Sequence, residues 1–294
     1  MFISETSSIE NIEENFPDIL YKYRNWSDIN HKTILSKQEV FFAAPESFSD
    51  KNDCRFPIDW NFTYESFRPY LNATFPGDKT LLLKKDYEFE LKNQYNSILG
   101  TEEKRLQFIE EYYFLSNYHL GILSLTARND NTEIWKSDYA VNFSGFCVGI
   151  DFKKCLELLA KNKIGGGKIS YVPESHPKFE YVSPHLTTGN EVLELFIKTL
   201  HTKYLPYGFE EEYRLTKYLF DNDYWNEVLI EDRKFVVPKE CFKSIIFGYK
   251  MTDSDIREII NLCNQQELKV DFFKAILTDK DQVLLEPVSA NLYL

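Results

Sequence analysis

The sequence predicts an α+β protein with a mixed, mainly antiparallel sheet and flanking helices. Short segments in which apolar and polar residues alternate recur along the chain, which is the pattern of strands with one buried face. Segments with apolar residues at helical spacing lie between them. The apolar content of 43%, with 24 Phe and 19 Tyr, is ample for a large core rich in aromatic side chains.

The first half of the chain alternates between expected strands and helices. Thr101 is a suitable N-cap, and the acids that follow it place negative charge in the first helical turn, where the helix dipole favours it. Asp151 is likewise expected to cap a helix of about ten residues that ends before Gly165. The expected strands cover residues 18–26, 39–44, 122–128 and 143–150, and the expected helices cover 30–36, 101–118 and a short piece around Trp135.

The second half continues this alternation. The segment Ile164-Gly-Gly-Gly-Lys168 lacks the first glycine and the final Ser or Thr of a phosphate-binding loop, so we expect a flexible turn between a helix and a strand. Thr252 and Asp255 have the spacing of a capping box at the start of a helix. The expected strands cover 167–172, a hairpin of 209–220 and 226–237, then 243–248, 269–277 and 282–288, and a helix covers 190–204.

No linker divides the 294 residues, so we expect a single elaborated domain over 16–294, preceded by a flexible polar leader over 1–15. The leader has neither the basic start nor the apolar run of a signal peptide, and no apolar stretch of about 18 residues occurs. Five scattered cysteines without a CxxC pair fit core thiols in a reducing compartment. These features predict a cytoplasmic protein that does not enter a membrane.

Charge and histidine spacing argue against two classes of partner. The net charge of −12 argues against broad binding to DNA or RNA, because such binding needs many cations to neutralise phosphates, although a small basic pocket stays compatible with it. The five histidines show neither i, i+4 pairing nor an HExxH motif, so no metal site is expected.

Three short segments combine an apolar face with polar groups that can act on a ligand. Successive side chains of a strand point to opposite faces, so residues two apart share a face. If the three strands are neighbours, their polar faces line one cleft. The polar residues are Lys22 and Arg24 in the first segment, Ser124, Thr126 and Arg128 in the second, and Glu210, Glu212, Arg214 and Thr216 in the third.

The paired acids and the basic residue each have two interpretations. Two carboxylates at Glu210 and Glu212 of one strand lie roughly 6.5 Å apart, which allows one to polarise a ligand hydroxyl and the other to stabilise a cation. On a solvated face the same acids would instead pair with Arg214. Arg24 can clamp a phosphate through its fork of donors, or it can simply close an ion pair.

Two further pairs of residues also allow two interpretations each. Ser124 and Thr126 fit a ligand pocket, but they also fit the ordinary hydroxyls of an edge strand. Trp135 and Tyr139, four residues apart on an expected helical turn, fit core aromatics packed under the 143–150 strand, and the alternative is a stacking platform for a base.

Several short motifs follow one another between residues 19 and 250: Tyr21-Lys-Tyr-Arg24, Ala44-Pro-Glu-Ser-Phe48, Leu123-Ser-Leu-Thr126, Ile134-Trp-Lys-Ser-Asp-Tyr-Ala140, Gly145-Phe-Cys-Val-Gly-Ile-Asp151, Ile169-Ser-Tyr-Val172, Phe209-Glu-Glu-Glu-Tyr-Arg214 and Ile245-Ile-Phe-Gly248. In this order they resemble an uncharacterised bacterial family, the domain of unknown function family 2971. The loop 49–53 departs from the family, which more often has Asn-Asp-Pro followed by an aromatic residue and an acid.

A basic residue on an early strand, then Ser-x-Thr, then Glu-x-Glu is also similar to the order of elements in ADP-ribosyltransferases. This resemblance implies an ADP-ribosyltransferase-like fold with NAD as substrate. Arg24, with Tyr21 beside it, would contact a phosphate or ribose of NAD. Ser124 and Thr126 would support the nicotinamide pocket. Glu212 would stabilise the ribosyl oxocarbenium ion, and Glu210 would position the acceptor or water.

The function expected from these resemblances is ADP-ribosyl transfer or NAD hydrolysis by an effector, in bacterial defence against phage. The partners would be a small nucleotide and a protein acceptor or regulator. The first alternative is a non-catalytic sensor or interaction module that binds a nucleotide or a phage component. The second is a metal-dependent nuclease built on Glu212 and Lys217, although their spacing puts these two residues on opposite faces of a strand.

Overall fold

The computed structural model describes residues 16–48, 50, 52–75, 84–181, 189–219 and 227–293, so the predicted leader lies outside the described residues. Chain contacts divide the molecule into two compact units. Unit 1 is formed by Pro45–Tyr118 and Val172–Thr202, and unit 2 by the chain up to Ala44, His119–Tyr171 and Lys203–Leu294. Both units are discontinuous in sequence, and the single domain predicted over 16–294 stays a prediction.

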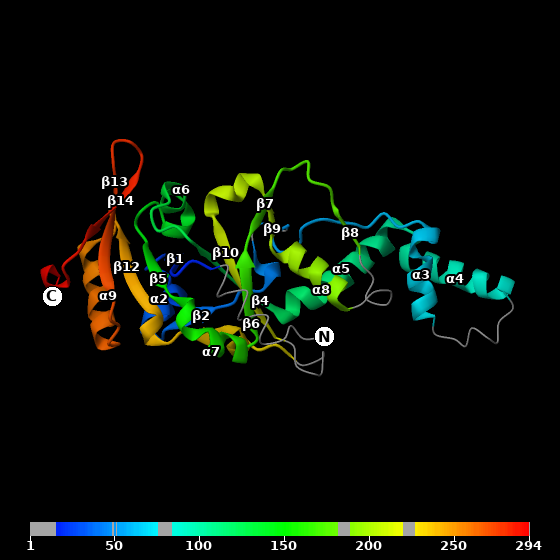
Figure 1. Ribbon diagram of the computed structural model, residues 1–294, viewed down its shortest axis with the longest axis horizontal. Coiled ribbons are helices and arrows are strands. Elements are labelled where there is room, and N and C mark those ends of the chain that lie inside the picture. Colours follow the sequence, from blue (N-terminus) through cyan, green and yellow to red (C-terminus); the bar gives the residue numbers. More distant parts are fainter. Residues whose placement is uncertain are drawn as a thin grey trace. The chain divides into compact units, whose positions relative to one another are not determined.

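An eight-stranded sheet forms the centre of unit 2 (Figure 1). The strand order is β14-β13-β12-β5-β1-β4-β10-β6. Neighbours are antiparallel except β12 and β13, which are parallel. The α+β class with a mixed, mostly antiparallel sheet is therefore confirmed. The strands are β1 (Leu20–Arg24), β4 (Leu120–Thr126), β5 (Phe146–Ile150), β6 (Ile164–Lys168), β10 (Glu212–Tyr218), β12 (Phe242–Gly248), β13 (Asp271–Leu277) and β14 (Val283–Pro287).

Short helices and a small second sheet complete unit 2. Helix α9 (Asp253–Gln265) begins as expected, because the Thr252 hydroxyl accepts the Asp255 N–H at 3.1 Å and donates to the Asp255 carboxylate at 2.8 Å. The other helices are α2 (Ile29–Ser36), α6 (Thr132–Lys136) and α7 (Leu156–Lys161), and β2 (Glu39–Phe41) pairs with β11 (Lys234–Val236). Strands β7 (Ser170–Val172) and β9 (Thr202–Tyr204) lie where the chain passes between the units.

The large sheet separates two apolar cores, because successive side chains of each strand point to opposite faces. The strands give core 1 a set of aliphatic residues that includes Leu20, Leu123, Val148, Leu215 and Ile245. Core 2 includes Tyr23, Cys147, Ile246 and Ala275 of the strands, with Ile134 and Trp135 of α6 and with Phe143. We call the two sides of the sheet the core-1 face and the core-2 face. All five cysteines are free and buried, which confirms the expected core thiols.

Unit 1 consists of helices around an aromatic cluster. Helix α3 begins with a capping box between Thr63 and Ser66. The Phe67 ring stacks on Tyr70 at 4.6 Å and meets Phe108 edge-on at 5.7 Å, which joins α3 to α5. The helices are α3 (Tyr64–Thr74), α4 (Lys84–Leu99), α5 (Glu102–His119, whose last residue belongs to unit 2) and α8 (Gly189–Leu200), with β3 (Ile58–Asp59) parallel to β8 (Phe179–Glu180). The expected turn at Pro76 and Gly77 lies outside the described residues.

Three predictions, of one strand pairing, one helix end and one helix cap, are wrong. The strand β11 pairs with β2 rather than forming a hairpin with β10, whose partners are β4 and β6. The expected helix over 190–204 ends at Leu200. Asp151 makes no side-chain cap, and a 3-10 turn (Phe152–Cys155) comes before α7.

The glycine-rich segment is the edge strand β6 rather than the expected flexible turn. It pairs with β10 over five positions, from Tyr213 opposite Lys168 to Lys217 opposite Ile164. A Cβ atom at Gly166 would lie 2.5 Å from the Arg214 carbonyl oxygen, so the missing side chain allows this close approach. Glycine here serves backbone packing and not flexibility.

Trp135 is packed as predicted, whereas the prediction for Tyr139 is wrong. Trp135 is fully buried in core 2, where it meets Tyr23 edge-on at 5.0 Å and stacks on Phe143 at 5.6 Å. Its indole N–H donates to the Asn129 carbonyl at 2.8 Å. Tyr139 is 56% exposed because it belongs to a separate 3-10 turn (Asp138–Ala140) and not to the helix of Trp135.

Replacing Trp135 by Ala should lower the free energy of unfolding by about 3–5 kcal/mol, because it empties a large core site and removes an indole hydrogen bond. Urea denaturation of the Trp135→Ala variant measures this loss. The exposed Leu284 of β14 gives a control, since Leu284→Ala should cost well under about 1 kcal/mol. Equal stabilities of the two variants would contradict the described packing of core 2.

Candidate functional site

The three polar segments lie on three adjacent strands, β1, β4 and β10, as the sequence suggested. Glu212 of β10 lies opposite Thr126 of β4, and Arg214 lies opposite Ser124. On the other side of β4, Tyr21 of β1 lies opposite Thr126. Residues directly opposite one another in antiparallel strands share a face. Tyr21, Ser124, Thr126 and Glu212 therefore lie together on the core-2 face.

Arg24 lies on the other side of the sheet, so the prediction that it lines a cleft with Ser124 and Glu212 is wrong. It is opposite Phe146 of β5, a core-1 residue. Burial lowers the pKa of Arg24 to about 10. Strand alternation relates residues within β1, but it cannot tell which face of β1 continues which face of β4.

Lys22 also starts from the core-1 face, opposite Val148, yet its amine reaches β4. Its Nζ donates a hydrogen bond to the Ser124 carbonyl oxygen at 2.5 Å. Burial lowers the pKa of Lys22 well below its ordinary value, and the nearby carboxylate of Glu212 acts in the opposite direction. The amine is thus held against the backbone of the strand that carries Ser124 and Thr126.

Glu210 is not on the same strand as Glu212, contrary to the prediction. It is the last residue of the 3-10 turn η5 (Leu205–Glu210), and β10 begins at Glu212. Between them Glu211 is left-handed (φ 42°, ψ 49°), and its N–H donates to the Gly208 carbonyl at 3.3 Å. This turn breaks the alternation on which the predicted spacing of the two acids depended.

Both acids nevertheless bind the same ammonium, that of Lys203 on β9. The Lys203 Nζ lies 2.8 Å from Glu210 Oε2 and 2.8 Å from Glu212 Oε2. Arg214 binds Glu212 at two points, with Nε 3.0 Å from Oε1 and Nη2 3.1 Å from Oε2. Two carboxylates thus meet two cations, and we call these four residues the charge cluster.

The charge cluster is nearly closed to water. The exposed fractions of the side chains are 10% for Lys203, 11% for Glu210, 3% for Glu212 and 0% for Arg214. Charges in such surroundings are stable only when they are paired and hydrogen-bonded. The predicted pairing of Arg214 with an acid is therefore present, but it lies in the interior and not on a solvated strand face.

Glu212 is held ionised by its partners. Burial acts to raise its pKa, but the charges of Arg214 and Lys203, with hydrogen bonds from Lys203 and Ser124, outweigh burial and lower the pKa to about 2. The carboxylate is therefore negative at neutral pH and is fixed in direction by the two-point contact with Arg214.

Two tyrosines border the charge cluster. The Tyr139 hydroxyl donates to Glu210 Oε1 at 3.1 Å, and partial burial together with the charge of Glu210 raises the pKa of Tyr139 to about 12. The Tyr171 hydroxyl accepts the N–H of Glu212 at 2.9 Å, and burial raises the pKa of Tyr171. Both phenols therefore remain protonated at neutral pH. Tyr139 fixes the side chain of Glu210 by donating to it, and Tyr171 fixes the backbone of Glu212 by accepting its N–H.

A strained loop positions Tyr139. Val141, Asn142 and Phe143 follow its 3-10 turn with φ values of 48°, 48° and 64°. Such left-handed residues cost on the order of 1–3 kcal/mol each and persist only where the surroundings enforce them. Here the Phe143 N–H donates to the Trp135 carbonyl at 2.9 Å. Through this hydrogen bond, the buried Trp135 anchors the loop that places the Tyr139 hydroxyl beside Glu210.

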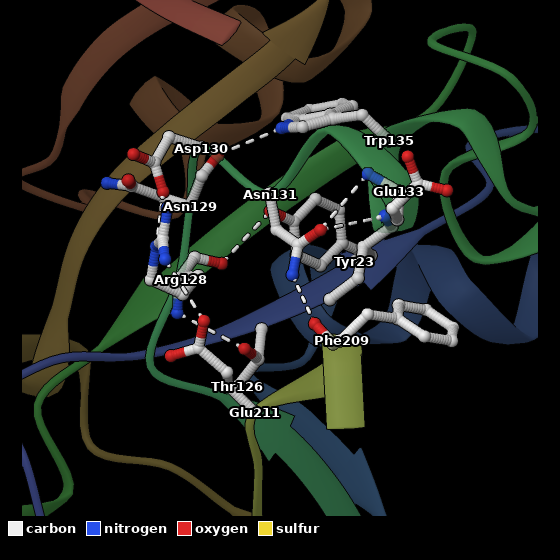
Figure 2. Close-up of polar contacts among 11 residues, drawn as sticks. Tyr23, Thr126, Arg128, Asn129, Asp130, Asn131, Glu133, Trp135, Phe209 and Glu211 are labelled. Carbon is white, nitrogen blue, oxygen red and sulfur yellow. Dashed lines mark hydrogen bonds and ion pairs between the residues drawn. The ribbon is translucent and has the colours of Figure 1, made fainter. Parts of the chain in front are cut away.

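The polar loop after β4 fixes the other side of the turn that carries Glu210 (Figure 2). Arg128 binds Asp130 at 2.6 Å and Glu211 at 3.0 Å. The Asn131 side chain donates to the Phe209 carbonyl. The Asn131 hydrogen bond holds the end of η5 against the loop that follows Ser124 and Thr126, whereas the Arg128–Glu211 pair lies at the surface, with side chains 46% and 44% exposed.

Lys203 is not among the predicted site residues, because it falls within the helix expected over 190–204, whereas it lies on β9. A signal for an earlier helix end was present. The β-branched Thr202 and the proline at 206 both disfavour a continuing helix. No comparable signal pointed to Lys203 as the partner of Glu210 and Glu212, because this pairing depends on how the chain returns to the sheet.

Within the described residues, no three His, Cys, Asp or Glu side chains are grouped so that they could hold a metal ion. Every helix in the same part of the chain is too short or too polar to span a bilayer. Comparisons with models of known families, with curated proteins and with solved structures give no match. The resemblances drawn from the sequence motifs therefore stay predictions.

Acid should destabilise the protein in a way that depends on Glu212. Its folded pKa of about 2 lies below the ordinary value of 4.5, so its stabilisation is complete above about pH 4.5 and is lost as the pH falls toward 2. A shift of this size corresponds to something on the order of 3 kcal/mol. Urea denaturation at a series of pH values measures the loss.

The Glu212→Gln variant should lose most of this acid dependence, because an amide does not titrate in this range. Glu211→Gln, which removes a surface acid paired with Arg128, should keep it. Identical pH dependence in Glu212→Gln and the unchanged protein would contradict the low pKa.

Proposed function

We propose that unit 2 carries an NAD-cleaving site, which transfers ADP-ribose to an acceptor or to water. The observation that carries this proposal is the shared face of Glu212, Ser124 and Thr126 on neighbouring strands, in register with one another. The order of these residues in the chain is the order that suggested the resemblance to ADP-ribosyltransferases.

The chemistry fits the state of Glu212. Cleavage breaks the glycosidic bond between ribose and nicotinamide, the bonding electrons leave with nicotinamide, and positive charge develops on the ribose. A carboxylate that is already ionised and fixed by Arg214 can stabilise that charge without reorganising. Glu210, held by Tyr139 and Lys203, is the group proposed to orient water or an acceptor for attack on the ribose.

In this proposal Ser124 and Thr126 support the nicotinamide, and Tyr21 flanks the same face. Arg24 has no part in it, because the sheet separates this residue from Glu212. A role as a bacterial effector against phage is part of this proposal. A nucleotide substrate, a protein acceptor or regulator and a cytoplasmic location belong to the same proposal.

A non-catalytic nucleotide sensor is a second candidate, and one observation favours it. The Glu212 side chain is only 3% exposed, and Arg214 and Lys203 bind both of its oxygens. A balanced buried network can serve to fix a unique fold, and a nearby surface could then bind a nucleotide without cleaving it. NAD turnover separates the two candidates.

The test is to incubate the purified protein with NAD and to measure nicotinamide release by chromatography. The proposal expects release by the unchanged protein and a loss of about a hundredfold or more in Glu212→Gln, the scale of removing one preorganised electrostatic group. Glu211→Gln is the matched control and should keep full activity, because Glu211 pairs with Arg128 at the surface.

Circular dichroism of each variant reports whether the fold persists. If Glu212→Gln does not fold, Glu212→Asp keeps the charge, withdraws it by one methylene and should still lose most of the activity. Full activity in either folded Glu212 variant would remove this residue from the site. Binding of NAD by the unchanged protein without any nicotinamide release would favour the sensor.

A further inference from the structure

The ammonium of Lys203 occupies a site with the features of a cation-binding site. Carboxylate oxygens of Glu210 and Glu212 lie 2.8 Å from it, one on each acid. The ring of Tyr207 lies 5.6 Å from the same nitrogen, within the range of a cation–π interaction. Two acids and an aromatic face around one cation form a recognition site for positive charge.

The two cations that bind Glu212 differ in how firmly they are fixed. Arg214 is fully buried and binds Glu212 at two points, so it belongs to the framework. The lysine ammonium sits on a flexible four-carbon stem and binds as a point charge. Tyr207 and Tyr139, which border this ammonium and Glu210, are 37% and 56% exposed. The rim of the site is therefore open to solvent on its aromatic side.

We infer that the Glu210–Glu212 pair with Tyr207 is a binding site for a cationic aromatic ring, and that Lys203 fills it in the free protein as a displaceable substitute. The identity of that ring rests on the proposed function, since the nicotinamide ring of oxidised NAD carries a positive charge. Displacing the ammonium leaves Glu212 with Arg214 and the ring cation, so the charge balance of the cluster is kept. Glu210 stays held by Tyr139, and cleavage makes the ring neutral, which releases Glu210 to orient water or an acceptor.

The test compares two probes that differ by one charge, the 1-methylnicotinamide cation and neutral nicotinamide, by isothermal titration calorimetry. In Lys203→Met the cation should bind at least about tenfold more tightly than the neutral ring, and more tightly than it binds to the unchanged protein. Adding Glu210→Gln to this variant should remove the preference. Equal binding of both probes, or binding of neither, would overturn the inference.

Lys168 gives a matched control, because its ammonium lies 5.9 Å from the Tyr213 ring and pairs with no carboxylate among the described residues. Lys168→Met should leave the binding of both probes unchanged. If Lys203→Met does not fold, the unchanged protein and Glu210→Gln are titrated with the same probes by NMR. A preference for the cation that Glu210→Gln abolishes supports the inference, and its absence overturns it.

Measuring nicotinamide release from NAD by the unchanged protein distinguishes failure of the cation-binding site from failure of the proposed NAD-cleaving activity. Cation preference without NAD cleavage retains the binding site and overturns the proposed activity. Cleavage without cation preference retains the activity and removes Lys203 and Tyr207 from the recognition of the ring.

Discussion

Charge compensation around Glu212 is the constraint on which the centre of unit 2 depends. The carboxylate lies almost wholly out of water, where an unpaired charge would cost several kcal/mol. Arg214 supplies compensation through two contacts with the carboxylate, and Lys203 supplies it through its ammonium at 2.8 Å. The surrounding elements position the members of the charge cluster. Pairing of β4 with β10 holds Arg214 beside Ser124, and the η5 turn places Glu210 within 2.8 Å of Lys203.

The same compensation connects stability with the proposed chemistry. An acid that is ionised and immobile before a ligand arrives is suited to stabilising developing positive charge. It is also a structural liability, because its partners must stay in place. The strained run at Val141–Phe143 is consistent with such a site, since left-handed non-glycine residues persist only where their surroundings enforce them, and here the Phe143 N–H is bonded to the Trp135 carbonyl. Stability and the proposed chemistry thus depend on the same few contacts.

Local patterns in the sequence predicted much of the fold. The alternation in β4 and β10 and the cap at Thr252 are signals within a few residues, and the structure has the elements they predict. The wrong predictions concerned features that depend on contacts between distant segments of the chain. The face of Arg24 is set by pairing with β5, and the strand at Gly166 is set by close approach to β10. Glu210 lies outside the strand because the next residue, Glu211, is left-handed. Because this residue is a glutamate and not a glycine, the sequence gives no sign of that conformation.

The ionisation of Glu212 tests this account most directly. Carbon-13 NMR of glutamate side-chain carboxyls, with Glu212 assigned by its loss in Glu212→Gln, follows the protonation of this single group as the pH is lowered. We predict that Glu212 stays ionised through the ordinary range near 4.5 and titrates only toward about 2. A midpoint at or above the ordinary value would contradict it, since burial would then outweigh Arg214 and Lys203.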